Sequence, residues 1–462
     1  MNLCIHGHFY QPPREDPISD YVPDEMGAEP FNNWNTRILS ECYAPNAQAG
    51  NFQNISFNVG PTLFSWIRNF APDVEKMIIQ QERRNYDKFG VGNGMAQGYN
   101  HIILPLAKRH DKITQIRWGI KDFEYRFGHK PVGMWLPECA VDLETLEVLS
   151  DCGIQFTILA PWQVRASSGQ NGPYLIELPG ERPPFTVFCY DQELSTRVSF
   201  QPESTTNGDI FLESLINSRA SQKDDLILIA SDGELYGHHQ PFRDRFLSYV
   251  LDGGGTKHNI EWTYPARWLL THEVKNQAEL VENTSWSCMH GTERWKQACG
   301  CTPGADWKKP LRLALDQIAE WVDAKYLDVL SPMFDDPWEL RHRYIDVILG
   351  QISLVDLCQE LAGEKWKPDQ LPRVNQLLEA QCERQKMYTS CGWFYDEFHR
   401  IEPQNNIAYA AKAVWLTQLA TGLDLSPAVL DLLREVKSQK TGLRGDTVFS
   451  QTLYRAEAEK IS

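Results

Sequence analysis

The fold is decided by a stretch that reads Leu226-Ile227-Leu228-Ile229-Ala230-Ser231-Asp232-Gly233-Glu234-Leu235-Tyr236-Gly237-His238-His239. Its first half is an unbroken apolar run, which is typical of a strand buried on both faces of a parallel sheet. Its second half brings two carboxylates, two glycines and two histidines together. In parallel α/β folds, functional side chains gather just past the carboxyl ends of strands. The pattern therefore favours a functional role for Asp232, although an acidic N-cap that opens the next helix would look the same.

A second carboxylate follows a short apolar strand in the same way. The segment Gly133-Met134-Trp135-Leu136-Pro137-Glu138 ends in an acid, and a helix-like pattern with leucines three residues apart begins soon after it. Glu138 and Asp232 could meet over the mouth of one barrel. Glycoside hydrolysis needs such a facing pair, because one carboxyl group attacks or stabilises the sugar cation and the other handles the leaving-group proton.

The composition of the chain argues against some classes of binding partner. The chain has 462 residues and a formal net charge of −16, which argues against nucleic acid and against an anionic membrane surface. No window approaches the length of apolar sequence that crosses a membrane. The N-terminal residues lack the basic and apolar regions of a signal peptide. Together with eleven cysteines, these features favour a reducing compartment, and we expect a cytoplasmic protein.

Further apolar runs alternate with helical patterns in the first part of the chain. The predicted strands cover residues 3–5, 55–59, 156–160, 186–190 and 260–262. This alternation predicts a βα-repeated barrel over residues 1–275, complete or slightly open. Residues 276–462 predict an all-helical C-terminal domain, because amphipathic helical patterns follow one another there. Those patterns cover residues 311–327, 337–349, 371–387, 405–421 and 426–437.

Histidines supply further candidate functional groups. His6 and His8 continue the first predicted strand, and a His-x-His pair on an extended segment points both imidazoles to one face. This arrangement suits metal ligands or hydrogen bonds to sugar hydroxyls, and a pair of satisfied structural histidines is the alternative. Because this segment offers only two candidate ligands, a metal-binding site is the weaker interpretation. His101 lies among polar residues, where a loop role and a substrate contact are equally compatible with the sequence.

A segment dense in aromatic and polar side chains lies between the two predicted domains. It contains Trp286, His290, Arg294 and Trp295. We expect it to be a loop that the C-terminal domain contributes to the active site, where these side chains contact substrate. Packing within the C-terminal domain is the alternative.

Three cysteines accompany these residues. Cys288, Cys299 and Cys301 could bind zinc together with His290, but their spacing is not the paired short spacing of known structural zinc sites. The sequence therefore predicts reduced, partly buried thiols, with no metal and no other cofactor.

Four motifs of the first domain resemble those of glycoside hydrolase family 57. The first motif is similar to His6-Gly7-His8-Phe9-Tyr10-Gln11-Pro12-Pro13, and the second to the segment around His101. The third resembles Trp135-Leu136-Pro137-Glu138, and the fourth resembles Asp232-Gly233-Glu234-Leu235-Tyr236-Gly237. Residues 288–301 and 387–394 also resemble a subgroup that carries an uncharacterised C-terminal domain.

The resemblance implies an incomplete seven-stranded (β/α)7 barrel followed by a helical lobe. It implies a retaining enzyme that acts on an α-glucan or oligosaccharide without a metal, with Glu138 as nucleophile and Asp232 as general acid/base. Amylase, glucanotransferase, branching enzyme and α-galactosidase activities all occur on this scaffold, so hydrolysis and transfer both stay open. The expected substrate-binding residues are His6, His8, Gln11, His101, Trp135, Glu234, His238, Trp286, His290, Arg294 and Trp295.

Two other functions are alternatives. A zinc-dependent hydrolase of the mannosidase or deacetylase type would use His6, His8 and Asp232 as ligands and would keep one coordination position open. A catalytically silent glucan-binding protein would keep the scaffold without turnover, and the presence of both Glu138 and Asp232 counts against it. The oligomeric state does not follow from the sequence.

Overall fold

The computed structural model describes residues 2–166, 172–219, 226–258 and 260–459. The chain divides into two compact units, each assembled from three segments. The barrel unit comprises Met1–Pro13, Pro23–Tyr99 and Asp122–Trp286. The helical unit comprises Arg14–Val22, Asn100–Lys121 and Ser287–Ser462.

The barrel unit is organised around its first strand, β1 (Asn2–Phe9), which is buried from Leu3 onwards. On one side β1 pairs in parallel with β9 (Leu226–Asp232). On the other side it pairs in parallel with β2 (Ser56–Val59) and, near its start, with β10 (Glu261–Trp262). The apolar residues of β9 are buried, as expected for a strand covered on both faces.

Four further parallel strands belong to the predicted (β/α)7 barrel. Parallel pairing joins β3 (Ala96–Gln97) to β4 (Met134–Trp135), and β5 (Phe156–Leu159) to β8 (Phe185–Cys189). Single bridges pair Phe57 of β2 with Gly94, just before β3, and Gly133, just before β4, with Phe156 of β5. Within the described ranges, β8 and β9 form no paired ladder, and the link between them is a 2.7 Å hydrogen bond from the Asp191 amide to the Leu228 carbonyl. The confirmed barrel is therefore incomplete on this side.

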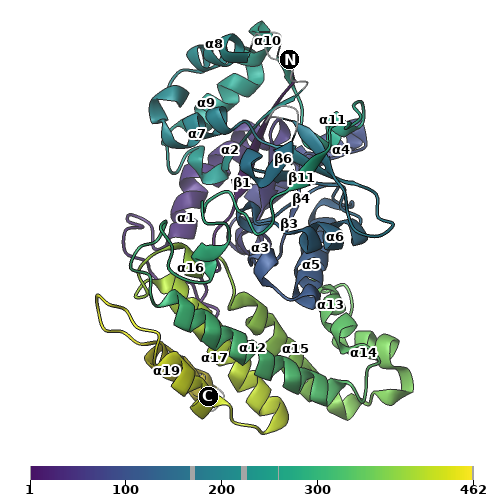
Figure 1. The fold of residues 1–462 in the computed structure, drawn as a ribbon, viewed down its shortest axis with the longest axis vertical. Coiled ribbons are helices and arrows are strands. Elements are labelled where there is room, and N and C mark those ends of the chain that lie inside the picture. The colour runs from purple at the N-terminus through teal and green to yellow at the C-terminus, as the bar shows by residue number, and fades with distance from the viewer. Residues whose placement is uncertain (1, 167–171, 220–225, 259, 460–462) are drawn as a thin grey trace. The chain divides into compact units, whose positions relative to one another are not determined.

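Helices that connect the strands lie on the outside of the barrel unit (Figure 1). Local signals start several of them: α3 and α4 have proline in their first turn, and Asp142 caps α6. The bounds are α3 (Pro61–Phe70), α4 (Pro72–Phe89), α6 (Leu143–Asp151), α7 (Gln192–Phe200), α8 (Gly208–Arg219), α9 (Arg243–Tyr249) and α11 (Pro265–Leu269).

The boundary between the units lies after Trp286, whereas the sequence predicted it after residue 275. The physical reason is a small antiparallel sheet in which β11 (Ala278–Leu280) pairs with β6 (Val164–Ala166). The Val281 amide also donates to the Gln163 carbonyl at 2.8 Å, so this segment stays attached to the barrel. Residues 14–22 and 100–121 belong to the helical unit, which a prediction with a single boundary could not express.

The helical unit consists of long helices that pack on one another. In Figure 1, α12 (Lys308–Leu330), α15 (Leu371–Lys386) and α17 (Ile401–Thr421) lie alongside each other, in agreement with their contacts. The remaining long helices are α13 (Pro337–Ile348), α14 (Leu354–Ala362), α18 (Ser426–Leu433) and α19 (Gly445–Glu459). The predicted helical C-terminal region is confirmed, while α14 and α19 were not predicted. Every helix in the described ranges is too short or too polar to span a lipid bilayer.

A buried network of charges lies inside the helical unit. Asp111 is 3.0 Å from Arg341 and 2.7 Å from Arg384, and Arg384 also lies 2.8 Å from Asp323. All four side chains are buried. Burial alone would raise the pKa of both carboxyl groups, but Arg384 and Arg341 hold these pKa values below the usual range. Each buried charge in the network thus has a partner of opposite sign.

We predict that Arg384→Met lowers the free energy of unfolding by about 3–5 kcal/mol, because Asp111 and Asp323 would lose the cation that they share. Urea denaturation at neutral pH measures this. Arg343→Met is the control, since it removes a more exposed pair with Glu360 and should leave the denaturation midpoint nearly unchanged. Equal effects of the two substitutions would contradict the prediction.

Candidate active site

Strand register places Asp232 level with His8 and Asn58. His8 of β1 is the register partner of Asp232 in β9 and of Asn58 in β2. Register partners point to the same face of a sheet, so these three side chains form one layer. His6 and His8 both stack on Trp135, which belongs to β4 and is not a neighbour of β1. Contact across to β4 shows that the layer faces the barrel interior.

Hydrogen bonds and burial determine the protonation of the two histidines. His6 Nδ1 lies 2.9 Å from Ser56 Oγ, and His6 Nε2 lies 3.1 Å from Asn58 Oδ1. A carboxamide oxygen only accepts, so His6 carries its proton on Nε2. The carboxamide of Asn58 also reaches His8 Nδ1, with its Nδ2 at 2.9 Å and its Oδ1 at 3.3 Å. Burial lowers the pKa of both imidazoles to about 3, so both are neutral at physiological pH.

Trp135 forms an aromatic wall in this interior. Its ring centroid is 4.7 Å from that of His6 and 4.9 Å from that of His8, and the ring of Trp286 meets it nearly at right angles. Two buried donors, Trp135 Nε1 and Gln97 Nε2, have no hydrogen-bond partner in the described part of the chain. An unsatisfied buried donor is costly unless a ligand or water accepts from it. An acceptor from a ligand or from water would satisfy both donors.

Glu138 is held in an unusual backbone conformation. Its φ is 56° and its ψ is 22°, and Cys139 follows with a φ of 47°. Residues other than glycine adopt this left-handed region only at a cost of order 1 kcal/mol, so other contacts must enforce it. Gln163 Nε2 donates to the Cys139 carbonyl at 2.7 Å, and the Trp286 amide donates to the Glu138 carbonyl at 3.0 Å. Trp286 Nε1 also donates to Glu138 Oε2 at 3.1 Å, so one residue holds both the backbone and the carboxylate.

Asp232 is a strand-end acid that caps no helix. A 3-10 helix, Gly233–Leu235, follows it, but the Asp232 side chain accepts no capping hydrogen bond. Asp191, at the end of β8, behaves differently: it accepts from the Leu194 amide at 3.0 Å and pairs with Arg219 at 2.5 Å. The N-cap alternative is therefore wrong for Asp232, whereas Asp191 does cap α7.

The surroundings of Asp232 change its acidity. The Asp232 side chain is exposed to solvent, although many protein atoms lie around its carboxyl group. This desolvation, together with the negative charge of Glu138, raises the pKa of Asp232 to about 7. A carboxyl group of this kind can carry a proton near neutral pH. The separation of about 5–5.5 Å that a retaining pair requires stays a prediction.

Glu234 and His238, which follow Asp232, contact protein groups. Glu234 Oε1 accepts from Tyr43 Oη at 2.6 Å and from the Tyr10 amide at 3.0 Å. Burial and the charge of Asp232 raise the pKa of Glu234 to about 8. His238 Nδ1 lies 2.5 Å from a carboxylate oxygen of Glu41. These contacts favour positioning roles for both residues.

Gln11 lies two residues beyond β1 and is half-buried. It belongs to the barrel unit, and its predicted substrate contact stays a prediction.

The other predicted substrate-binding residues belong to the helical unit. His101 has a φ of 55°, and its Nδ1 lies 2.6 Å from Ser390 Oγ. Arg294 stacks on the Phe394 ring at 4.3 Å and donates to the Phe394 carbonyl. These contacts favour packing within the unit, which was the alternative for Arg294, and substrate binding by both residues stays a prediction.

Trp295 and His290 have different surroundings. Trp295 is buried and, with Tyr388 and Trp393, lines a cavity of about 250 Å³ within the helical unit. His290 lies among Cys288, Cys299 and Cys301, whose ligand atoms come within 4.8 Å of one another. In the described part of the chain, these four residues form the one group with the donor set of a metal site.

Comparison with known proteins gives two family matches. The model of glycosyl hydrolase family 57 matches residues 5–273, and that of a domain of unknown function (DUF3536) matches residues 304–460. A curated relative, the 4-alpha-glucanotransferase of Thermococcus litoralis, is 26% identical over 220 residues, which cover 47% of this chain and 28% of that protein. The chain thus aligns with less than a third of that relative's length.

Solved structures share the fold. An exo-type maltose-forming amylase from Pyrococcus sp. ST04 matches with a TM-score of 0.74 and 15% identity, over 98% of this chain and 88% of that chain. A GH57-type branching enzyme from Pyrococcus horikoshii matches with a TM-score of 0.62 and 15% identity, over 98% of this chain and 94% of that chain.

We predict that Asp232→Asn stabilises the protein at alkaline pH. The folded-state pKa of about 7 lies above the unfolded value of about 3.9, so the ionised carboxylate lowers stability as the pH rises through this window. The melting temperature of the variant should exceed that of the wild type at pH 8, and the two should converge below about pH 4.

Asp191→Asn is the matched control, because Asp191 also ends a strand but pairs with Arg219. Its melting temperature should fall at pH 8. A lower melting temperature for Asp232→Asn at pH 8 would show that this carboxylate is stabilised by its surroundings.

Proposed function

The chain belongs to glycosyl hydrolase family 57, and on that premise we propose that it is a retaining glycosidase or transglycosidase that acts on α-glucans. The observation that carries the proposal is the state of Asp232. It ends a barrel strand, caps no helix, and has a pKa raised to about 7 by its surroundings and by Glu138. A general acid that works near neutral pH needs such a pKa.

In the proposed reaction, Glu138 is the nucleophile. Its carboxylate attacks the anomeric carbon while Asp232 gives its proton to the leaving glycosidic oxygen, and a covalent glycosyl-enzyme forms. Asp232, now ionised, then takes a proton from an incoming hydroxyl group, which displaces Glu138 from the sugar. Water as the acceptor gives hydrolysis, and a sugar hydroxyl gives transfer.

The neighbouring groups have supporting roles in this proposal. The Trp286 indole N–H orients the Glu138 carboxylate, and the flat ring of Trp135 offers a surface for a sugar. Trp135 Nε1 and Gln97 Nε2 would donate to sugar hydroxyls, which would satisfy both buried donors. His6 and His8 both contact the Asn58 carboxamide, which holds the two imidazoles in place.

The zinc-dependent alternative is disfavoured by the hydrogen bonds of His6. Both of its ring nitrogens are engaged, one with Ser56 and one with Asn58. A metal ligand must present a free nitrogen lone pair, so a site made of His6, His8 and Asp232 would have to break this network.

The proposed substrate rests on the relatives of this chain, and the proposed location rests on its cysteine content. Relatives named as glucanotransferase and alpha-amylase support an α-glucan or oligosaccharide as substrate, with either transfer or hydrolysis as the outcome. A cytoplasmic location stays an expectation that rests on the eleven cysteines of the sequence.

We predict that the two carboxyl groups give different kinetic defects. Glu138→Ala should abolish turnover of maltooligosaccharides while glucan binding persists, because no nucleophile remains. Asp232→Ala should lower kcat by about 10²–10⁴-fold on natural substrates, and much less on aryl α-glucosides whose leaving groups need no proton.

Product analysis on maltooligosaccharides and glycogen tests the same proposal and separates hydrolysis from transfer. Asp191→Ala is the control, since this acid caps α7, and it should reduce stability without a leaving-group effect. Equal losses on natural and activated substrates for Asp232→Ala would overturn the acid/base role.

We predict that Trp286→Phe lowers kcat by about 10–100-fold with little change in KM, because the hydrogen bond to the charged Glu138 carboxylate is lost while the ring remains. Steady-state kinetics on one maltooligosaccharide measures this. Trp162→Phe is the control, since Trp162 Nε1 donates at 3.0 Å to the backbone carbonyl of Ser285. A raised KM with unchanged kcat would instead assign Trp286 to substrate binding alone.

A further inference from the structure

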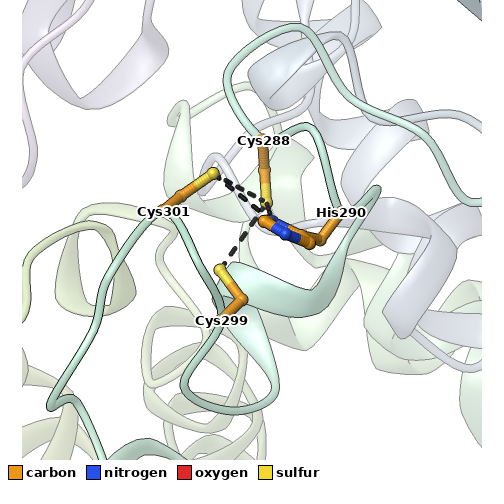
Figure 2. Close-up of side chains that lie close together, drawn as sticks. All are labelled: Cys288, His290, Cys299 and Cys301. Atoms are coloured by element: carbon orange, nitrogen blue, oxygen red, sulfur yellow. Dashed lines mark hydrogen bonds between the residues drawn. The ribbon is translucent and has the colours of Figure 1, made fainter.

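Four side chains with metal-binding atoms converge in a loop of the helical unit (Figure 2). They are Cys288, His290, Cys299 and Cys301, and their ligand atoms all lie within 4.8 Å of one another. Cys288 Sγ is 3.9 Å from the Sγ atoms of Cys299 and Cys301, and Cys301 Sγ is 3.5 Å from His290 Nδ1. These sulfurs are too far apart for disulfides, in which the S–S distance is about 2.05 Å.

The separations match the edges of a tetrahedral zinc site. Zinc binds thiolate sulfur at about 2.3 Å, so two sulfurs on one tetrahedral ion lie about 3.8 Å apart. We propose that Cys288, His290, Cys299 and Cys301 form a closed Cys₃His site for a zinc ion. Soft thiolate ligands select zinc over magnesium or calcium, and four protein ligands leave no open position, so the role is structural.

Two tight turns present the ligands. The Gly291 amide donates to the Cys288 carbonyl at 3.1 Å, and the Thr302 amide donates to the Cys299 carbonyl at 2.9 Å. Gly300, between two of the cysteines, permits the approach of the imidazole: a Cβ atom at this position would lie 2.9 Å from His290 Cε1. A side chain at position 300 would therefore force the His290 ring to shift.

Backbone amides face two of the cysteine sulfurs, although burial raises the pKa of the Cys288 thiol. Backbone amides of His290 and Arg294 donate to the Cys288 sulfur, and amides of Cys301 and Thr302 donate to the Cys299 sulfur. Hydrogen bonds of this kind stabilise the deprotonated ligand and fix its orientation.

A buried cation lies beside the cluster. Lys308 is buried, its Nζ donates to Thr302 Oγ1 at 3.1 Å, and Asp396 is the carboxylate that interacts with it. A buried ammonium group needs a counter-charge. Three thiolates around one Zn²⁺ carry one net negative charge, which would add to the charge of Asp396.

The cysteine spacing had predicted reduced thiols without a metal, because Cys-x-His and Cys-x-Cys pairs differ from the usual Cys-x-x-Cys pairs. The intervening loop nevertheless brings the Cys288–His290 pair close to the Cys299–Cys301 pair. That loop carries Arg294 and Trp295, so the metal would fix the segment that places Trp295 at the cavity of the helical unit.

The test is the metal content of the full chain, purified without a polyhistidine tag. Elemental analysis should find about one zinc per chain, as a closed four-ligand site requires. The double variant Cys299→Ser/Cys301→Ser should lose this zinc. Cys152→Ser, which changes a cysteine of the barrel unit, should keep it. Less than about a tenth of an equivalent in the wild type, with no uptake of added zinc, would overturn the proposal.

A second measurement uses the wild-type chain, so the test does not depend on whether the double variant folds. Stepwise modification of the thiols with an organomercurial should release zinc, followed with a chromogenic chelator. Replacement of zinc by Co²⁺ should give the intense visible bands of a tetrahedral, thiolate-bound ion. A spectrum of octahedral Co²⁺, or a disulfide among the three cysteines found by mass spectrometry, would contradict the site.

Discussion

The parallel register of β1 with its two neighbours is the constraint on which the barrel interior depends. It sets His8 between Asn58 and Asp232, and sets His6 beside Ser56. A slip of one residue would turn both histidines to the other face of the sheet and separate them from the partners that satisfy their ring nitrogens. Two neutral histidines can be buried here because the strand on one side supplies an amide and a hydroxyl at the right level.

The sequence predicted the strand ends well and their roles only in part. The apolar run before Asp232 and the short strand before Glu138 mark parallel strands, since burial on both faces demands such runs. Which strand-end acid caps a helix was not predictable. Asp191 and Asp232 share the same local pattern, and the path of the backbone that follows decides whether the carboxylate meets an amide.

The sequence did not predict the contacts between distant parts of the chain. Trp286 donates to a carboxylate 148 residues earlier, and no local pattern encodes that pairing. The left-handed backbone at Glu138 is held by another contact of Trp286, from its backbone amide, and by Gln163. Likewise, the spacing of Cys288, Cys299 and Cys301 describes their order along the chain, whereas metal binding depends on the loop geometry that brings them together.

The interleaving of the two units has a consequence for biosynthesis. Residues 14–22 and 100–121 leave the ribosome early, but the helices that hold them come much later. Asp16 pairs with an arginine 439 residues further on, and Asp111 with one 273 residues further on. Such long-range pairs slow folding, because loop closure precedes any gain from contact. The nascent chain therefore carries two segments of the helical unit before their partners emerge, and residues 14–22 wait until α19 is made. A barrel cut after Trp286 would still contain both segments.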